Sequence, residues 1–424
     1  MEIKEKSYGR GITLRYINTD KFKKNSLKLS FMSERELMNV SSSKLLASTL
    51  SRGCRRYPSV KAISRELCLL YEADLALYSS NTSALTEFTV SATMLDDRYA
   101  FDGGNIFGGV IDLISELLFE PIVEDGGLNR AYFESERKRR IEMIRAEINN
   151  KDRYALSQAA RHAFRGTPLG VRDTEESISA VTAEYCYATL QRLLCSCPIY
   201  ISFTGNYTEE KAAQIDRLVD RFLAARKGFQ TPQAGCSTFA FTDEIPEEHV
   251  TESVNAKQGR MVLMYSVPNT KRGDCAPMIF DEIFGASPTS RLFTNVRERM
   301  SLCYYCSSTL SRLQGVMTVR SGLDRDKKDE AIAEIDRQLS LLCDPKNIGQ
   351  DELENAKLSR LTNYAELTDD PSRYLSWYNS SVMGGFEDSI EELCAALEAV
   401  TAEDVASVAR SVKRRLCYFL DGVQ

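Results

Sequence analysis

A five-residue sequence occurs twice in the chain, once toward the end of each half. Residues 180–184 read Ala-Val-Thr-Ala-Glu, and residues 399–403 read the same, 219 positions later (399 − 180). In both copies the threonine suits the N-cap of a helix, and an aromatic strand ending in glycine follows the expected helix. Because the separation is about half of the 424-residue chain, the repeat indicates an internal duplication.

The hydrophobic patterning is consistent with two similar halves. Alternating apolar and polar residues predict strands, and periods near 3.6 predict helices. In the first half we expect strands at 12–17, 26–31, 75–79, 85–93 and 198–205, and helices at 41–52, 61–71, 106–118, 128–149, 154–164, 183–194 and 209–225. In the second half we expect strands at 261–267, 302–320 and 416–422, and helices at 276–284, 290–298, 329–342, 351–367, 372–381, 389–397 and 402–412. The sequence therefore predicts an α+β fold with two homologous halves, each a mainly antiparallel sheet covered by helices.

The periodicity stops in one internal stretch. Glycine, proline, glutamine, serine and threonine accumulate there, as they do in linkers. We expect an N-terminal half at 1–225, a linker at 226–248 and a C-terminal half at 249–424.

Composition narrows the class of function. The net charge of −6 and the pI of about 5.4 give no basic field for nucleic acid. The first residues are charged and no apolar targeting segment follows them, and no apolar run of about 18 residues would cross a membrane. The twelve cysteines are mostly scattered singly. These features favour a cytoplasmic protein with reduced thiols.

Cys303 and Cys306 form the one C-x-x-C sequence of interest. The run around them is aromatic and resembles a strand, in which side chains three positions apart point to opposite faces. A structural zinc site would also need a second pair of ligands. The sequence therefore argues against both a redox pair and half of a zinc site.

Histidine is scarce. Only His162 and His249 occur, one in each half, so neither an H-x-x-E-H nor an H-E-x-x-H zinc motif can form. The glycine-rich run 101–109 lacks the Lys-Ser/Thr ending of a phosphate-binding loop, and no G-x-S-x-G or calcium-loop pattern is present.

The strongest positive signal lies at residues 287–308, which read SPTSRLFTNVRERMSLCYYCSS. A helix with a basic end leads into a strand here, and this would place Arg297 and Tyr304 at one edge. A guanidinium can hold a carbonyl or carboxylate with two hydrogen bonds, and a phenol can donate to a developing oxyanion. The alternative is a basic helix end with Tyr304 as packing.

This block resembles the S-R-L-F…R-E-x-R-x-L-x-Y sequence in the second half of insulinase-like and mitochondrial processing peptidases. The resemblance implies their two-half fold. It also implies a zinc motif in the first half. Aligning Gly53 with the family's glycine places Lys44, Ala47 and Ser48 at the two histidines and the catalytic glutamate, and Glu147 at the distal ligand. None of the first three can perform that chemistry.

The resemblance thus implies a branch that has lost the zinc motif. Within that branch, the chain is similar to a bacterial group of proteins associated with the aminopentanol modification of elongation factor P. Such a chain would be a non-catalytic subunit of a heterodimeric zinc peptidase, with Arg297 and Tyr304 binding peptide for a homologous partner that carries H-x-x-E-H. No cofactor is expected in this chain, and zinc is expected only in the partner. The alternative is a peptide-binding or scaffold protein with no proteolytic role, linked to translation-factor modification. We expect neither nucleic acid nor membrane as a partner.

Overall fold

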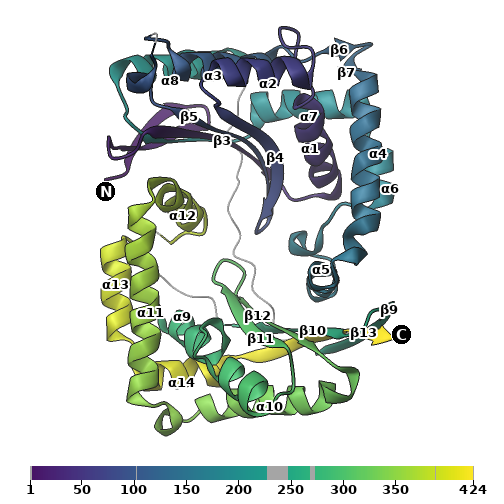
Figure 1. Ribbon diagram of the computed structural model, residues 1–424, viewed down its shortest axis with the longest axis vertical. Helices are drawn as coiled ribbons and strands as arrows, with labels where there is room; N and C mark the ends of the chain where they lie inside the picture. The colour runs from purple at the N-terminus through teal and green to yellow at the C-terminus, as the bar shows by residue number, and fades with distance from the viewer. Residues whose placement is uncertain (1, 102, 227–246, 268–272, 387, 424) are drawn as a thin grey trace. The chain divides into compact units, whose positions relative to one another are not determined.

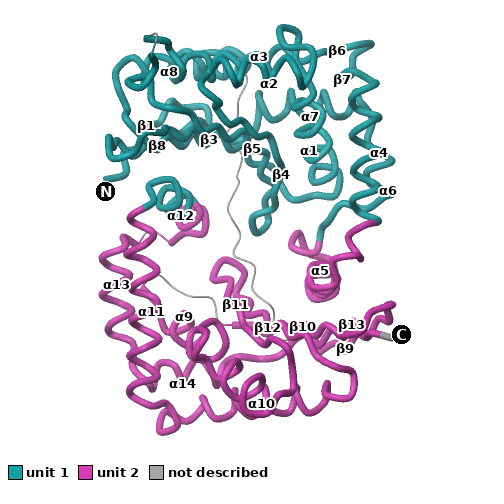
Figure 2. The backbone as a smooth tube through the Cα atoms, viewed as in Figure 1, with its two compact units in different colours: residues 1–145, 171–235, 370–379 teal, residues 146–170, 236–369, 380–424 magenta. Residues whose placement is uncertain are grey.

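The computed structural model describes residues 2–101, 103–226, 247–267, 273–386 and 388–423 (Figure 1). Nearly all of the stretch expected to be a linker, residues 227–246, lies outside the described residues. The chain forms two compact units, shown in different colours in Figure 2. Unit 1 comprises residues 1–145, 171–235 and 370–379, and unit 2 comprises residues 146–170, 236–369 and 380–424.

Unit 1 contains a six-stranded sheet with helices packed on it. The strand order is β1 (Lys4–Gly9), β2 (Ile12–Asn18), β8 (Ile199–Gly205), β3 (Lys24–Glu34), β5 (Leu85–Leu95) and β4 (Asp74–Thr82). The helices are α1 (Leu37–Leu50), α2 (Val60–Leu69), α3 (Ile106–Phe119), α4 (Arg130–Ala146), α6 (Glu175–Ala180), α7 (Ala183–Ser196) and α8 (Glu209–Ala225). A short pair, β6 (Val123–Glu124) and β7 (Gly127–Leu128), precedes α4.

Unit 2 contains a five-stranded sheet. Its order is β11 (Tyr305–Ser311), β12 (Val316–Leu323), β10 (Gly259–Ser266), β13 (Lys413–Val423) and β9 (Glu248–Asn255). The helices are α5 (Lys151–Ala163), α9 (Ala276–Asp281), α10 (Lys328–Leu342), α11 (Gln350–Asp369), α13 (Ile390–Ala399) and α14 (Ala402–Ser411), with π-helical segments η4 (Glu282–Ala286) and η5 (Leu292–Arg299).

The two sheets have the same topology, which confirms the duplication and the expected fold class. The order β2-β8-β3-β5-β4 corresponds to β9-β13-β10-β12-β11. In each sheet the pair at one end of this order, β2–β8 or β9–β13, is parallel, and the other pairs are antiparallel. Thr182 accepts a hydrogen bond from the backbone of Tyr185 at the start of α7, as Thr401 does from Asp404 at the start of α14. The repeated pentapeptide therefore begins the helix before the equivalent strand in each half.

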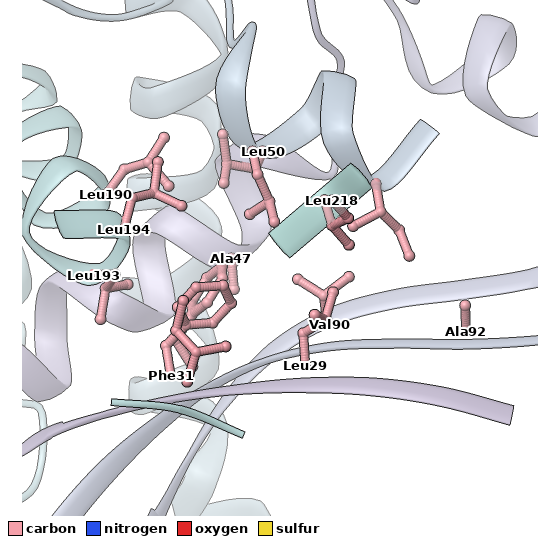
Figure 3. Packing of buried hydrophobic residues seen from close by; sticks show 14 of the residues in the cluster. Leu29, Phe31, Ala47, Leu50, Val90, Ala92, Leu190, Leu193, Leu194 and Leu218 are labelled. Carbon is pink, nitrogen blue, oxygen red and sulfur yellow. The ribbon is translucent and has the colours of Figure 1, made fainter. Parts of the chain in front are cut away.

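The core of unit 1 lies between its sheet and helices α1 and α7. Leu29 and Phe31 are two positions apart on β3, so both point to one face of the sheet, where they meet Val90 of β5 (Figure 3). Ala47 of α1 and Leu193 of α7 pack against this face, and all five side chains are buried. Burying such apolar side chains supplies roughly 1.5–3 kcal/mol each for the large ones, which explains why the alternating pattern fixes the strand register.

Each unit also takes one segment from the other half of the sequence. Helix α5 packs on β10 and β13 of unit 2, where Ala155 and Ala159 lie against the apolar side chains of the sheet. Residues 371–379 of α12 (Pro371–Met383) belong to unit 1, where Ser372 bonds Thr204 (2.8 Å) and Asn379 donates to Ser202 (2.7 Å). The compact units therefore do not correspond to a single division of the chain.

Several element boundaries differ from expectation. The strand expected at 302–320 is two strands, β11 and β12, joined by a turn in which Gly315 has φ of +58°. Helix α4 ends at Ala146, so Glu147 begins a short 3₁₀ turn, Glu147–Asn149, rather than continuing the expected helix. None of the described helices is both long and apolar enough to span a bilayer.

Candidate functional site

The positions aligned with the zinc motif lie on α1. Ala47 is buried and has no donor atom, and the Ser48 hydroxyl donates to the backbone oxygen of Lys44 (3.1 Å). Lys44 donates to the carboxylate of Asp173, which comes after α5 in the chain. The other oxygen of that carboxylate accepts from Arg140 of α4 (2.7 Å). Two cations and one carboxylate therefore occupy this part of unit 1.

The charges explain how this cluster is stabilised. Burial would raise the pKa of Asp173, but Lys44 and Arg140 outweigh it and hold that pKa below its ordinary value. Burial lowers the pKa of Lys44, and Asp173 partly opposes that effect. Only 4% of the Asp173 side chain is exposed, so these ions lie in a low-dielectric environment.

This donor set does not fit zinc. Zinc needs ligands with free lone pairs, whereas Lys44 presents an ammonium group and the Asp173 carboxylate already accepts from two cations. No group of three or more histidine, cysteine or carboxylate side chains that could hold a metal occurs in the part of the chain that the structure describes. The fourth aligned position, Glu147, is partly exposed and belongs to unit 2, whereas the other three belong to unit 1.

Arg297 and Tyr304 lie on consecutive segments of unit 2. Arg297 is on η5, whose buried Leu292 and Val296 anchor the segment to the core. The guanidinium of Arg297 lies 4.6 Å from the ring centroid of Phe293, in a cation–π contact. Arg297 is exposed.

Backbone contacts fix the chain between η5 and β11. Leu302 N donates to Val296 O (3.0 Å), and Tyr304 N donates to Gly322 O of β12 (2.8 Å). Tyr304 is 53% exposed, and its hydroxyl donates to Asp324, 3.2 Å from one carboxylate oxygen. Both expected substrate-binding side chains are thus exposed, Arg297 in contact with Phe293 and Tyr304 with Asp324.

Arg291, in the same sequence block, has a structural role. It is buried and forms two hydrogen bonds of 2.8 Å to Glu352 of α11 and one of 2.7 Å to Asn347 O. These contacts hold the start of η5 against α11. Sequence reasoning identified neither Asp173 nor Glu352, because no motif or spacing connects these carboxylates to partners 129 and 61 positions away.

The expectation for Cys303 and Cys306 was wrong in its geometry. Cys303 precedes β11, which begins at Tyr305, so strand alternation does not apply to it. Cys306 lies opposite Ser321 in the β11–β12 pair. A hydrogen bond from Cys306, supported by Ser321 and the charge of Arg297, lowers the pKa of Cys303.

Comparison with known proteins identifies the family that shares this arrangement of two equivalent sheets. Residues 199–359 match the family model described as the peptidase M16 inactive domain. The expected resemblance is therefore confirmed, and residues 199–359 are similar to the inactive domain of the M16 peptidases.

Relatives extend the match beyond that range. The chain is 24% identical over 426 aligned residues to a protein of Bacillus subtilis (strain 168) named probable inactive metalloprotease YmfF, covering 99% of this chain and 98% of that protein. It is 22% identical to an uncharacterized zinc protease of Rickettsia bellii, over 69% of this chain and 71% of that protein.

Solved structures show the same fold over the whole chain. A conserved protein from Enterococcus faecalis V583 superposes with a TM-score of 0.88 at 23% identity, covering 99% of both chains. A peptidase M16 inactive domain from Pseudomonas fluorescens superposes with a TM-score of 0.78 at 14% identity, covering 100% of this chain and 99% of that one.

Proposed function

We propose that the chain is a non-catalytic subunit of a heterodimeric M16-type zinc peptidase and binds the peptide substrate through Arg297 and Tyr304. One observation carries the proposal: these two side chains of unit 2 are exposed and oriented, whereas Lys44, Ala47 and Ser48 supply neither a base nor a metal ligand. A homologous partner with H-x-x-E-H would supply zinc and the general base. This chain would then need no cofactor of its own.

The local geometry suits peptide binding. Stacking on Phe293 uses the face of the Arg297 guanidinium and leaves its N–H edges able to donate two hydrogen bonds to a carbonyl or carboxylate. The Tyr304 hydroxyl donates to Asp324 at an exposed position. Water competes for such a bond, so exchanging Asp324 for a peptide oxygen costs little free energy.

The first test identifies the partner. The chain is purified from its native host under mild conditions, and the bound proteins are identified by mass spectrometry. Recovery of a homologue with H-x-x-E-H in a defined ratio is the expected result. Recovery of proteins of translation-factor modification, without such a homologue, would instead support the scaffold function.

The second test measures peptide turnover by the reconstituted pair together with the melting temperature of each variant. Arg297→Ala and Tyr304→Phe are expected to leave folding and pairing intact and to lower turnover by roughly 10²-fold, as loss of one preorganised donor does. Arg297→Lys is not expected to restore turnover, because an ammonium group cannot form the two-point contact.

Matched controls separate substrate binding from general effects. Arg325 is another exposed arginine of unit 2, 3.3 Å from Asp421, and Tyr99 is an exposed tyrosine of unit 1. Arg325→Ala and Tyr99→Phe should leave turnover unchanged. Full turnover in both Arg297→Ala and Tyr304→Phe would refute the assigned role.

A further inference from the structure

A polar cleft lies on unit 2, beside η5. Its volume is about 360 Å³, at the lower end of the roughly 300–1,000 Å³ of small-molecule sites. One wall is η5 with the turn before it, another is α10, and residues around the start of α11 complete the lining. Of the ten residues that line it, only Leu341 is apolar. Such a lining suits a charged or polar ligand, because an apolar one would displace water without replacing its hydrogen bonds.

Arg291 supplies a buried guanidinium to this cleft. Arg291 is only 9% exposed, and its Nε and Nη2 each donate to Glu352 at 2.8 Å. Nη2 also donates to Asn347 O (2.7 Å). The guanidinium has five N–H donors, and its Nη1 makes no hydrogen bond to the residues that the structure describes. The two N–H groups of Nη1 are therefore available to a ligand.

Arg299 brings a second cation to the same cleft. It is the last residue of η5 and is exposed, and its Nη1 donates to the side-chain oxygen of Asn295 (3.1 Å). Within the described parts of the chain, no carboxylate lies at ion-pair distance from Arg299. The contact with Asn295 orients the guanidinium and leaves its charge uncompensated.

The charges around the cleft do not balance. Arg337 of α10 forms two hydrogen bonds to Glu334, of 2.7 and 2.8 Å, as Arg291 does to Glu352. With Arg299, three arginines that line the cleft meet these two carboxylates, which leaves one excess positive charge (3 − 2 = 1). An anion that enters the cleft is attracted by this excess and completes the charge balance.

Hydroxyl groups add neutral donors from another direction. Thr289 lies on the turn before η5 and Thr294 on η5, and both line the cleft. The hydroxyl of Thr294 makes no hydrogen bond to the described protein, and that of Thr289 lies 3.3 Å from the hydroxyl of Ser287. Donors from a turn, η5 and α10 surround one cleft. This spread matches a tetrahedral group, whose oxygens point in several directions, better than a planar carboxylate.

We propose that this cleft binds the phosphoryl group of a small molecule. Arg299 and Nη1 of Arg291 donate charge-assisted hydrogen bonds to its oxygens, and Thr294 donates a neutral one. Glu352 does not oppose the ligand, because both of its carboxylate oxygens already accept from Arg291. The site lies within unit 2 and does not depend on the proposed peptidase function.

The first experiment titrates the full-length chain with inorganic phosphate in a calorimeter. Sodium chloride holds the ionic strength constant, since salt screens such charges. Two charge-assisted hydrogen bonds predict one site with a Kd on the order of 1 mM. Arg299→Ala should weaken binding at least about tenfold, and Thr294→Val should weaken it less. Arg325→Ala, which removes an exposed arginine of unit 2 outside the cleft, should leave the Kd unchanged.

The second experiment locates the ligand on the wild-type chain, so it does not depend on the folding of a variant. Phenylglyoxal modifies exposed arginines, and mass spectrometry of the digested protein identifies the positions. Phosphate should slow the modification of Arg299 and leave that of Arg325 unchanged. Equal protection at the two positions would mean general screening and would overturn the site.

A comparison of ligands tests the chemical class. Succinate carries two carboxylates and is titrated at the same ionic strength as phosphate. Phosphate should bind more tightly, and tighter binding of succinate would overturn the phosphoryl assignment. An unchanged Kd for phosphate in Arg299→Ala, with the melting temperature of the wild type, would overturn the role of this cleft.

Discussion

Lys44 and Asp173, 129 positions apart in the chain, form an ion pair inside unit 1, and the same carboxylate accepts from Arg140. Lys44 is one of the positions that the family resemblance places in the zinc motif. A carboxylate shared by two cations occupies this part of unit 1.

Removing the shared carboxylate should destabilise the protein. Asp173→Asn leaves Lys44 and Arg140 close together without a counter-charge, and we expect a loss of about 3 kcal/mol in the free energy of unfolding. Lys44→Met should cost less, because Arg140 still neutralises Asp173. Urea denaturation measures both. The exposed pair of Arg145 and Glu175 is the control, and Arg145→Ala should give no measurable change. Equal stability of Asp173→Asn and wild type would show that the cluster does not support the fold.

Metal content tests the assignment of the zinc-motif positions. The purified chain should hold no stoichiometric zinc after dialysis against a weak chelator, because the side chains at 44, 47 and 48 offer no zinc ligand set. Elemental analysis gives the answer directly. Retention of about one zinc per chain that disappears in Glu147→Gln would refute the assignment.

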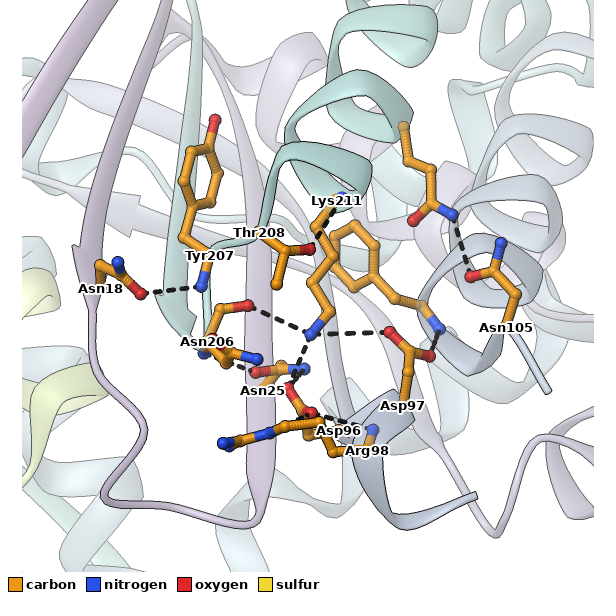
Figure 4. Close-up of polar contacts among 12 residues, drawn as sticks. Asn18, Asn25, Asp96, Asp97, Arg98, Asn105, Asn206, Tyr207, Thr208 and Lys211 are labelled. Carbon is orange, nitrogen blue, oxygen red and sulfur yellow. Dashed lines mark hydrogen bonds and ion pairs between the residues drawn. The ribbon is translucent and has the colours of Figure 1, made fainter. Parts of the chain in front are cut away.

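A second buried ion pair predicts that the stability of the protein depends on pH in the acid range. Lys211 Nζ lies 2.6 Å from Asp96, and neither side chain is more than 3% exposed (Figure 4). Burial by itself would raise the pKa of Asp96, but hydrogen bonds from Lys211, Asn25 and Arg98 outweigh it and hold that pKa well below its ordinary value.

The direction in which pH changes the free energy of unfolding follows from the depressed pKa of Asp96. A carboxyl with a depressed folded-state pKa contributes stability above its unfolded pKa of about 3.9 and loses it as the pH falls through the folded value. Unfolding free energy should therefore fall below about pH 4, and the fall should be shallower in Asp96→Asn. That variant should also lose roughly 3 kcal/mol near neutral pH, because Lys211 stays buried without its partner. Parallel acid profiles for the two proteins would contradict this account.

The exchanged segments predict the result of cutting the chain between its halves. A protease site inserted within 227–246 and then cleaved should leave the two fragments associated. Unit 1 needs 371–379 of α12, which bonds β8 through Ser372 and Asn379, and unit 2 needs α5, which covers β10 and β13. Size-exclusion chromatography before and after cleavage measures this. Separate elution of the fragments would show that these segments contribute little to holding the two fragments together.

Much of the fold could be predicted because strands and helix starts depend on residues that are close in the sequence. The apolar–polar alternation in β3 and the N-caps at Thr182 and Thr401 are features of this kind, and the threonine cap occurs in both halves. The Arg–Tyr segment could be located for the same reason, because its signal lies within about 20 consecutive residues. The absence of a zinc motif was readable from the histidine count alone.

The sequence by itself determined the class of fold and the duplication. The roles that it suggests for Lys44, Ala47, Ser48, Arg297 and Tyr304 stay predictions. Only the tertiary structure decided that Asp173 meets Lys44, and that α5 and residues 371–379 of α12 each pack in the unit formed mainly by the other half of the sequence. The physical reason is that propensity and periodicity act over a few residues, whereas ion pairs and packing join groups wherever the chain brings them together. The C-x-x-C expectation was wrong for that reason: the strand begins at Tyr305, three residues later than expected, so the alternation assumed for Cys303 does not apply to it.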